Sequence, residues 1–148
     1  MNKETTSYED ILETKPFFVI TPKGTSMLPL LRQGIDTIKV IKPTSPFKKY
    51  DVILFKRKDG SYVLHRIIKV KKNCLYLCGD NQVIKEKVMY DQVIGLMEGY
   101  FREEEYISCS DKSYLKYSKR RVASRPFRFI RYFLSRIYHK IFKKDKKK

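Results

Sequence analysis

The chain has few residues of the kinds that hold metals or form covalent cross-links. Its 148 residues include two histidines and three cysteines, and Cys74, Cys78 and Cys109 contain no C-x-x-C pair. An odd number of cysteines without metal-ligand spacing predicts reduced, buried or half-buried thiols, so we expect no metal site and no cofactor. A chain of this length can bury the core of one domain without disulfides or metals.

Long uncharged apolar runs are also missing from the sequence. A membrane-spanning helix needs roughly 18 to 20 such residues, but the most aromatic candidate, residues 127–142, is interrupted by four basic side chains. No apolar signal peptide precedes the rest of the chain. We therefore expect a cytoplasmic protein without a transmembrane helix, or one that is peripheral at the inner face of the membrane.

Positive charge is concentrated at one end of the chain. The formal charge is +17; residues 119–148 carry 13 Lys/Arg against the single Asp145, whereas residues 1–118 carry 20 Lys/Arg against 15 acids. Such a basic tail predicts an anionic partner, either phospholipid or nucleic acid. The more balanced body contains no recognisable RNA- or DNA-binding motif, so nucleic acid is the less expected partner.

Hydrophobic periodicity predicts a mainly β body that follows a short helix. Residues 1–16 are expected to form a helical lead-in, with Ser7 as N-cap three residues before Asp10. Short β-prone runs then continue to residue 101, and Asp59-Gly60 predicts a tight hairpin. The expected strands are 17–21, 37–41, 52–56, 62–70, 75–77 and 93–101.

Residues 102–148 are expected to form a connector, a basic amphipathic helix and a disordered Lys-rich end over 143–148. Pro126 suits the first turn of that helix, in which apolar residues recur at three- and four-residue steps. Three roles stay open for the helix: packing on the β body, lying among anionic lipid headgroups, or binding nucleic acid. The residues expected to meet a membrane are Phe127, Arg128, Ile130, Arg131, Leu134, Arg136, Ile137 and Ile141.

Two residues far apart in the sequence form a possible nucleophile and base. Ser26 lies in the glycine turn G-T-S-M-L-P of residues 24–29, and His65 follows 39 residues later in L-H-R-I. A serine hydroxyl is a poor nucleophile without a neighbouring base, and the ordinary pKa of imidazole is close to working pH. The pair predicts nucleophilic catalysis.

The residues beside Ser26 predict how a substrate would be held. Gly24 lets a substrate backbone come close, and the N–H groups of Thr25 and Ser26 can face a developing oxyanion. Met27 and Pro29 are the expected substrate contacts.

Alternation along a strand predicts which way the histidine points. His65 should share one strand face with Val63 and Ile67 and so face an apolar layer, while Arg66 points away from it.

Three blocks together resemble the serine peptidase superfamily that contains signal peptidases and LexA-type self-cleaving repressors. They are the serine block at 24–29, Y-D-V-I-L-F at 50–55 followed by L-H-R-I at 64–67, and G-D-N at 79–81 with I-G at 94–95. The resemblance covers residues 17–101. It implies a LexA/signal-peptidase-like coiled β fold, with a peptidase-like domain over that range.

The resemblance also implies roles for individual residues. Ser26 matches the nucleophile, and His65 matches the general base of the endoplasmic-reticulum and archaeal signal peptidases, where most other members have lysine. An acidic helper is implied at Asp80, or at Glu86 where the family has aspartate. Gly24 stands where bacterial leader peptidases commonly have serine, so the oxyanion would depend on backbone N–H groups.

The predicted function is that of a serine endopeptidase that uses a Ser/His dyad on a peptide or protein substrate, such as a precursor's leader. Two alternatives stay open. One is a self-cleaving member of the fold, and the other is a non-catalytic module that binds anionic membrane or nucleic acid through the basic tail.

Overall fold

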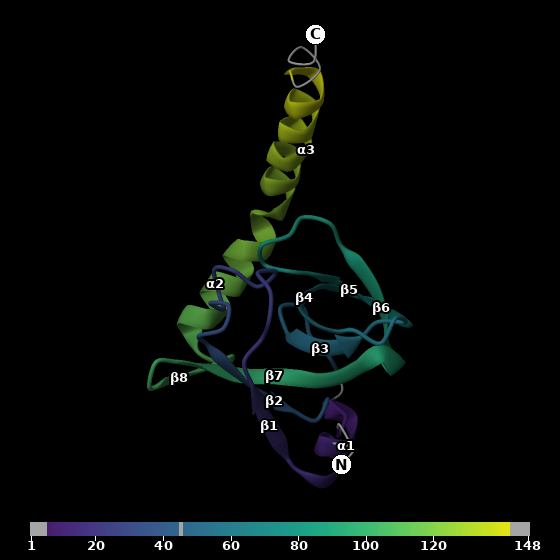
Figure 1. Ribbon diagram of the computed structural model, residues 1–148, viewed down its shortest axis with the longest axis vertical. Helices are drawn as coiled ribbons and strands as arrows, with labels where there is room; N and C mark the ends of the chain where they lie inside the picture. Colours follow the sequence, from purple (N-terminus) through teal and green to yellow (C-terminus); the bar gives the residue numbers. More distant parts are fainter. Residues whose placement is uncertain (1–5, 45, 143–148) are drawn as a thin grey trace, which may run out of the picture.

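The computed structural model describes residues 6–44 and 46–142, and the Lys-rich end predicted over 143–148 lies outside the described residues. The protein is mainly β, as the sequence predicts. An antiparallel sheet runs in the order β1-β2-β7-β3-β4-β5-β6, and β8 pairs with β7 (Figure 1). Its strands are β1 (Phe17–Ile20), β2 (Thr37–Ile41), β3 (Val52–Lys56), β4 (Tyr62–Val70), β5 (Cys74–Cys78), β6 (Glu86–Met89), β7 (Val93–Arg102) and β8 (Glu105–Ser108).

All six expected strands are confirmed, and β6 and β8 are additional. Both additional strands have only four residues, and each begins with a glutamate. Such short segments are too brief to show a clear apolar alternation in the sequence. They are strands because β6 pairs with β5 and β8 pairs with the second half of β7.

The predicted turn at Asp59-Gly60 joins β3 to β4. Gly60 has a φ of +85°, and its N–H donates to the Arg57 carbonyl at 2.9 Å. The Asp59 carboxylate accepts the Ser61 N–H at 2.9 Å. The turn fixes the register of the hairpin, which places His65 opposite Ile53 on β3.

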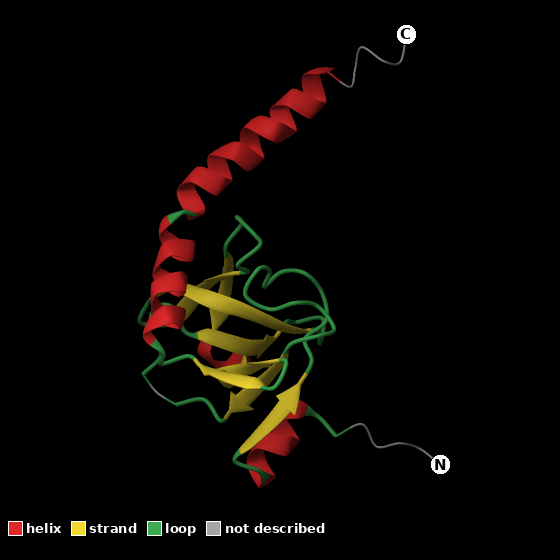
Figure 2. Cartoon of the chain, turned by 90° about the vertical axis from the view of Figure 1, so that its left-hand side faces the viewer, coloured by secondary structure: helices red, strands yellow, loops and turns green. Residues whose placement is uncertain are grey.

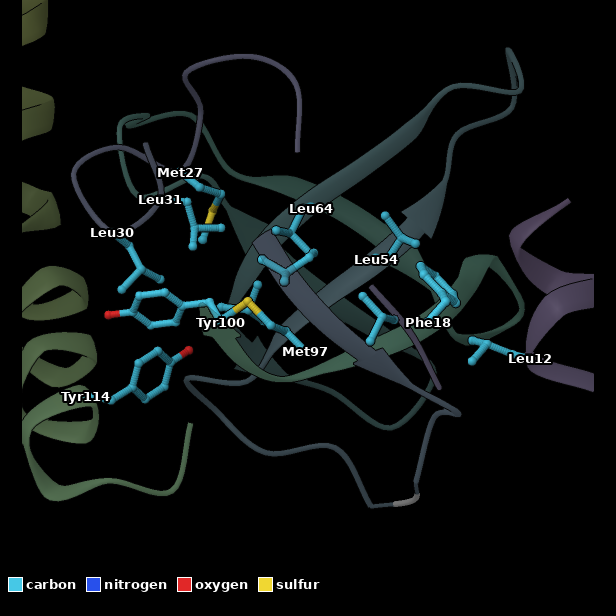
Figure 3. Close-up of a cluster of buried hydrophobic side chains, with 13 residues drawn as sticks. Leu12, Phe18, Met27, Leu30, Leu31, Leu54, Leu64, Met97, Tyr100 and Tyr114 are labelled. Carbon is cyan, nitrogen blue, oxygen red and sulfur yellow. The ribbon is translucent and has the colours of Figure 1, made fainter. Parts of the chain in front are cut away.

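The sheet is buried on both faces at β3. Val52 and Leu54 pack with Leu64 in a larger cluster, whereas Ile53 and Phe55 pack with Ile67 in a smaller one. Figure 3 shows the larger cluster, with Leu12 of α1 (Tyr8–Thr14) at one end and Tyr114 of α2 (Lys112–Ala123) at the other.

His65 lies on the side of the smaller cluster, as strand alternation predicts. Its ring centroid is 5.9 Å from that of Phe55. Its neighbour Arg66 therefore points to the opposite face of β4.

The first helix forms where it was expected. The Asp10 N–H donates to Ser7 Oγ at 3.1 Å, and the Ser7 N–H donates to Asp10 Oδ2 at 3.2 Å. This reciprocal pair is a capping box. It starts α1 so that Leu12 is buried in the larger cluster.

The second helix, α2, was not expected. Residues 102–148 were assigned to a connector and one helix, but β8 pairs within the sheet and α2 buries Tyr114 and Ser118 against it. The packed body therefore continues beyond residue 101. Figure 2 shows α2 lying along the strands before the chain leaves the body.

The third helix, α3 (Arg125–Phe142), has Pro126 in its first turn, as predicted. None of its residues is buried. Figures 1 and 2 show it projecting away from the sheet. Within the described residues, every helix is too short or too polar to span a membrane.

Candidate active site

Ser26 lies in the turn-rich segment between β1 and β2. Gly24 has a φ of +87°, a backbone conformation that residues with a Cβ rarely adopt. Beyond the serine, the Leu31 N–H donates to the Met27 carbonyl at 3.0 Å, and Met27 is buried in the larger cluster. The serine is thus half-buried between a glycine turn and an anchored apolar residue.

The G-D-N segment holds the backbone of Ser26 in place. The Asn81 N–H donates to the Ser26 carbonyl at 2.7 Å. A Cβ at Gly79 would lie 2.7 Å from the same carbonyl oxygen, too close for any other residue without a shift of the backbone. Glycine at position 79 therefore permits the two segments to touch.

Ser26 and His65 line the same cavity, of about 200 Å³. Its walls come from the segment around Ser26, from the start of β4 and from Gln82 just after the G-D-N segment. The fold thus brings together two residues that are 39 positions apart in the sequence.

His65 is neutral at physiological pH. Its side chain is 3% exposed, and burial lowers the pKa of the imidazole to about 4, opposed by the charge of Glu86 and assisted by that of Arg57. Burial disfavours the charged imidazolium. A neutral ring is the form that accepts a proton from a serine hydroxyl.

Glu86, on β6, is the carboxylate that faces the ring of His65. Its Oε2 lies 3.8 Å from His65 Nδ1, which is beyond hydrogen-bond distance. Arg57 binds both carboxylate oxygens, at 2.7 and 2.8 Å, and lowers the pKa of Glu86. Within the described residues His65 Nδ1 is buried and has no hydrogen-bond partner. Glu86 is the acidic residue that lies within 4 Å of this nitrogen.

Asp80 forms an ion pair with Arg66 and not with His65. Its two oxygens accept from Arg66 Nε and Nη2 at 2.8 and 2.7 Å, and Tyr117 donates to Oδ2 at 3.0 Å. In the part of the chain that the structure describes, no hydrogen bond joins Asp80 to His65. Of the two acids left open by the sequence, the structure thus places Glu86 beside the ring and Asp80 beside Arg66.

Arg66 is the centre of a buried polar network that the sequence analysis missed. The side chain is 1% exposed. Its Nη1 donates to the Tyr50 carbonyl at 3.0 Å, to the Tyr114 hydroxyl at 3.1 Å and to Ser118 Oγ at 2.7 Å. An arginine inside an otherwise apolar strand was the one available signal, but its partners on α2 were not predicted.

The peptide group between Asp80 and Asn81 connects the two C-terminal helices to Ser26. Its carbonyl accepts from Arg121 Nε at 2.6 Å and from Arg128 Nη1 at 2.9 Å, while its N–H is the donor to Ser26. Arg128, which was expected to meet a membrane, thus binds the β body through its guanidinium group. Its guanidinium also donates to the Gln82 carbonyl at 3.0 Å.

The expected substrate and oxyanion residues are only partly at the cavity. Met27 lines it but is 4% exposed, and its side chain points into the apolar cluster (Figure 3). Pro29 is exposed and lines a separate hollow beside α2. Within the described chain, the N–H groups of Thr25 and Ser26 make no hydrogen bond to another backbone group.

Residues 6–44 and 46–142 contain no group of three side chains placed to hold a metal ion. Comparison with models of known protein families and with curated proteins finds no match.

Proposed function

We propose that this protein is a serine endopeptidase with the coiled β fold of the signal peptidase and LexA-type superfamily. The observation that carries the proposal is that Ser26 and a neutral, buried His65 line one cavity. Two of the sequence blocks that resemble the superfamily contribute to the walls of this cavity, the serine block and L-H-R-I, and the G-D-N segment binds the Ser26 carbonyl.

The reaction would proceed through an acyl-enzyme. Ser26 Oγ attacks the scissile carbonyl carbon while His65 accepts the hydroxyl proton, and the oxyanion is met by the N–H groups of Thr25 and Ser26. The C–N bond then breaks, and the imidazolium gives its proton to the departing amine. Water, deprotonated by His65, releases the acyl group from the serine.

Glu86 is the residue that would stabilise the imidazolium. The charge of His65 increases during the attack, and the carboxylate at 3.8 Å from Nδ1 raises the pKa of the ring. Arg57 keeps that carboxylate ionised and in position. Asp80 would act on the site only through the backbone that it helps to order.

The substrate class is an extended peptide, such as the leader segment of a precursor. Strand β5 pairs with β4 only from Arg66 onward, so within the described residues the edge of β4 at residues 62–65 that faces away from β3 has no strand partner next to the cavity. An extended peptide can add to such an edge through main-chain hydrogen bonds.

A fluorophosphonate probe is expected to label Ser26 and to do so only when His65 is present. Because a positioned base contributes about 10²- to 10⁴-fold, His65→Gln should slow labelling by at least about 100-fold. Intact-mass spectrometry and peptide mapping would measure the rate and the site. The His139→Gln variant, which removes the histidine of α3, is the matched control and should label normally. Equal labelling of the His65→Gln protein would refute the proposed base.

The rate of that labelling is expected to rise with pH through about 4 and then to stay level at neutral pH. The folded pKa of His65 is lowered to about 4, so the ring is a protonated, inactive base only below that value. Because Glu86 raises the pKa of the ring, Glu86→Gln should move the rise to lower pH. Glu98→Gln on β7 removes the same charge elsewhere and should leave it in place. A rise near 6.5 would contradict the buried, neutral ring.

A further inference from the structure

We propose that α3 binds the surface of an anionic phospholipid bilayer, with its apolar face among the lipid chains and its basic flanks among the headgroups. This inference concerns a second surface of the protein and does not depend on the proposed peptidase activity.

The apolar side chains of α3 are exposed to solvent along its whole length. Phe127 is 73% exposed, Leu134 59% and Ile141 57%, and none of the 18 residues of the helix is buried. A contiguous exposed apolar surface on a protein generally marks an interaction site.

These side chains form one continuous face. At 3.6 residues per turn, seven of them fall within an arc of about 140° that contains no charged residue. The face extends over about 21 Å of helix. Its members are Phe127, Ile130, Phe133, Leu134, Ile137, Tyr138 and Ile141.

The rotation of α3 about its axis turns this face away from the protein. Arg128 donates to the Asp80 and Gln82 carbonyls at 2.9 and 3.0 Å, so its side of the helix faces the body. Arg128 lies about 150° around the helix from the centre of the apolar arc. Packing of the apolar face on its own β body, one of the three roles left open by the sequence, would break both hydrogen bonds.

The charge of α3 complements an anionic lipid surface. Arg131 and Lys140 border the two edges of the apolar arc, and the helix contains no acidic residue. Long basic side chains at the edges of an apolar face can extend to headgroup phosphates while the face is inserted. Anionic lipids attract such residues electrostatically.

The same features disfavour the other partners. In a second copy of the chain, apposed apolar faces would bring basic edges together with no acid on either α3 to neutralise them. Nucleic acid would contact basic residues but leave the apolar face in water. A bilayer surface accommodates both the apolar face and its basic edges.

The test compares two neighbouring substitutions that add the same charge inside and outside the apolar face of α3. Leu134→Glu places a carboxylate on the apolar face, and Ser135→Glu places it on the polar face. Full-length protein would be co-sedimented with vesicles of phosphatidylglycerol and phosphatidylcholine in equal amounts, at physiological salt. Leu134→Glu should weaken binding about 10- to 100-fold, as expected when one large apolar side chain no longer inserts, whereas Ser135→Glu should change it less than about threefold.

Circular dichroism would confirm that both variants are folded, which is expected because both positions are exposed. Equal vesicle binding by wild type and Leu134→Glu would overturn the proposal, as would equal binding to pure phosphatidylcholine vesicles. A dimer in light scattering that Leu134→Glu converts to a monomer would assign the face to a second copy instead. Tighter binding of a single-stranded RNA oligonucleotide than of vesicles would assign the helix to nucleic acid. The soluble probe at Ser26 tests the peptidase separately.

Discussion

Replacing Ser26 by alanine is expected to abolish peptide hydrolysis. Removal of the nucleophile eliminates the acyl-enzyme route, so kcat should fall by at least about 1,000-fold, and by up to about 10⁶-fold if the enzyme matches well-studied serine peptidases. A defined mixture of peptides, incubated with purified protein and followed by mass spectrometry, would measure the loss. The half-buried hydroxyl is not part of the apolar core, so the variant should retain its fold.

The matched control for this experiment is Ser61→Ala, which removes an exposed hydroxyl in the turn between β3 and β4. It should cleave the same peptides at the wild-type rate. Cleavage by Ser26→Ala at that rate would show that the activity comes from another residue or a contaminant, and the proposed nucleophile would be rejected.

Asp80→Ala is expected to lower the free energy of unfolding by about 3–5 kcal/mol. The substitution leaves Arg66 charged and 1% exposed, with no anionic partner at its guanidinium. Arginine keeps its proton in proteins, so Arg66 stays charged in the variant and cannot avoid this penalty by becoming neutral. Urea denaturation followed by circular dichroism would give the difference.

Glu98→Ala is the comparison for this prediction, because it breaks a partly exposed pair with Lys39 and should cost no more than about 1 kcal/mol. If Asp80→Ala does not fold, the double variant Arg66→Met/Asp80→Leu provides the measurement. It removes both charges and should recover most of the lost stability. An Asp80→Ala protein as stable as Glu98→Ala would contradict the structural role of this ion pair.

Local patterns in the sequence predicted most of the sheet and the first and last helices. The capping box at Ser7, the Asp59-Gly60 turn and the alternation around His65 are all properties of short segments, and each is present in the structure. The period of apolar residues likewise located α3, and Pro126 located its start.

The elements that sequence reasoning missed depend on contacts between distant segments. Strand β8 forms by pairing with the far half of β7, and α2 is held by Tyr114 and Ser118 around a buried arginine. A stretch rich in serine, lysine and tyrosine shows no apolar period that would reveal such packing. Burial of a charged residue can be recognised only after its partners are known.

The candidate site was predicted only in part, because it too depends on contacts between distant segments. Ser26 and His65 were identified from their residue types and spacing, and the structure places both at one cavity. The choice between Asp80 and Glu86 was not available from spacing, because it depends on where Arg66 and Arg57 direct their guanidinium groups. Pro29 lines a different hollow from Ser26, because a neighbour in sequence need not face the same cavity.

An amide group is planar and resists twisting, so its oxygen and its hydrogen move together. The amide after Asp80 has its oxygen bound by arginines of both C-terminal helices and its hydrogen bound by the backbone of Ser26. A movement of α3 that displaces Arg128 would therefore act on an amide that also binds the backbone of Ser26. The base of α3 and Ser26 are thus linked through a single planar group.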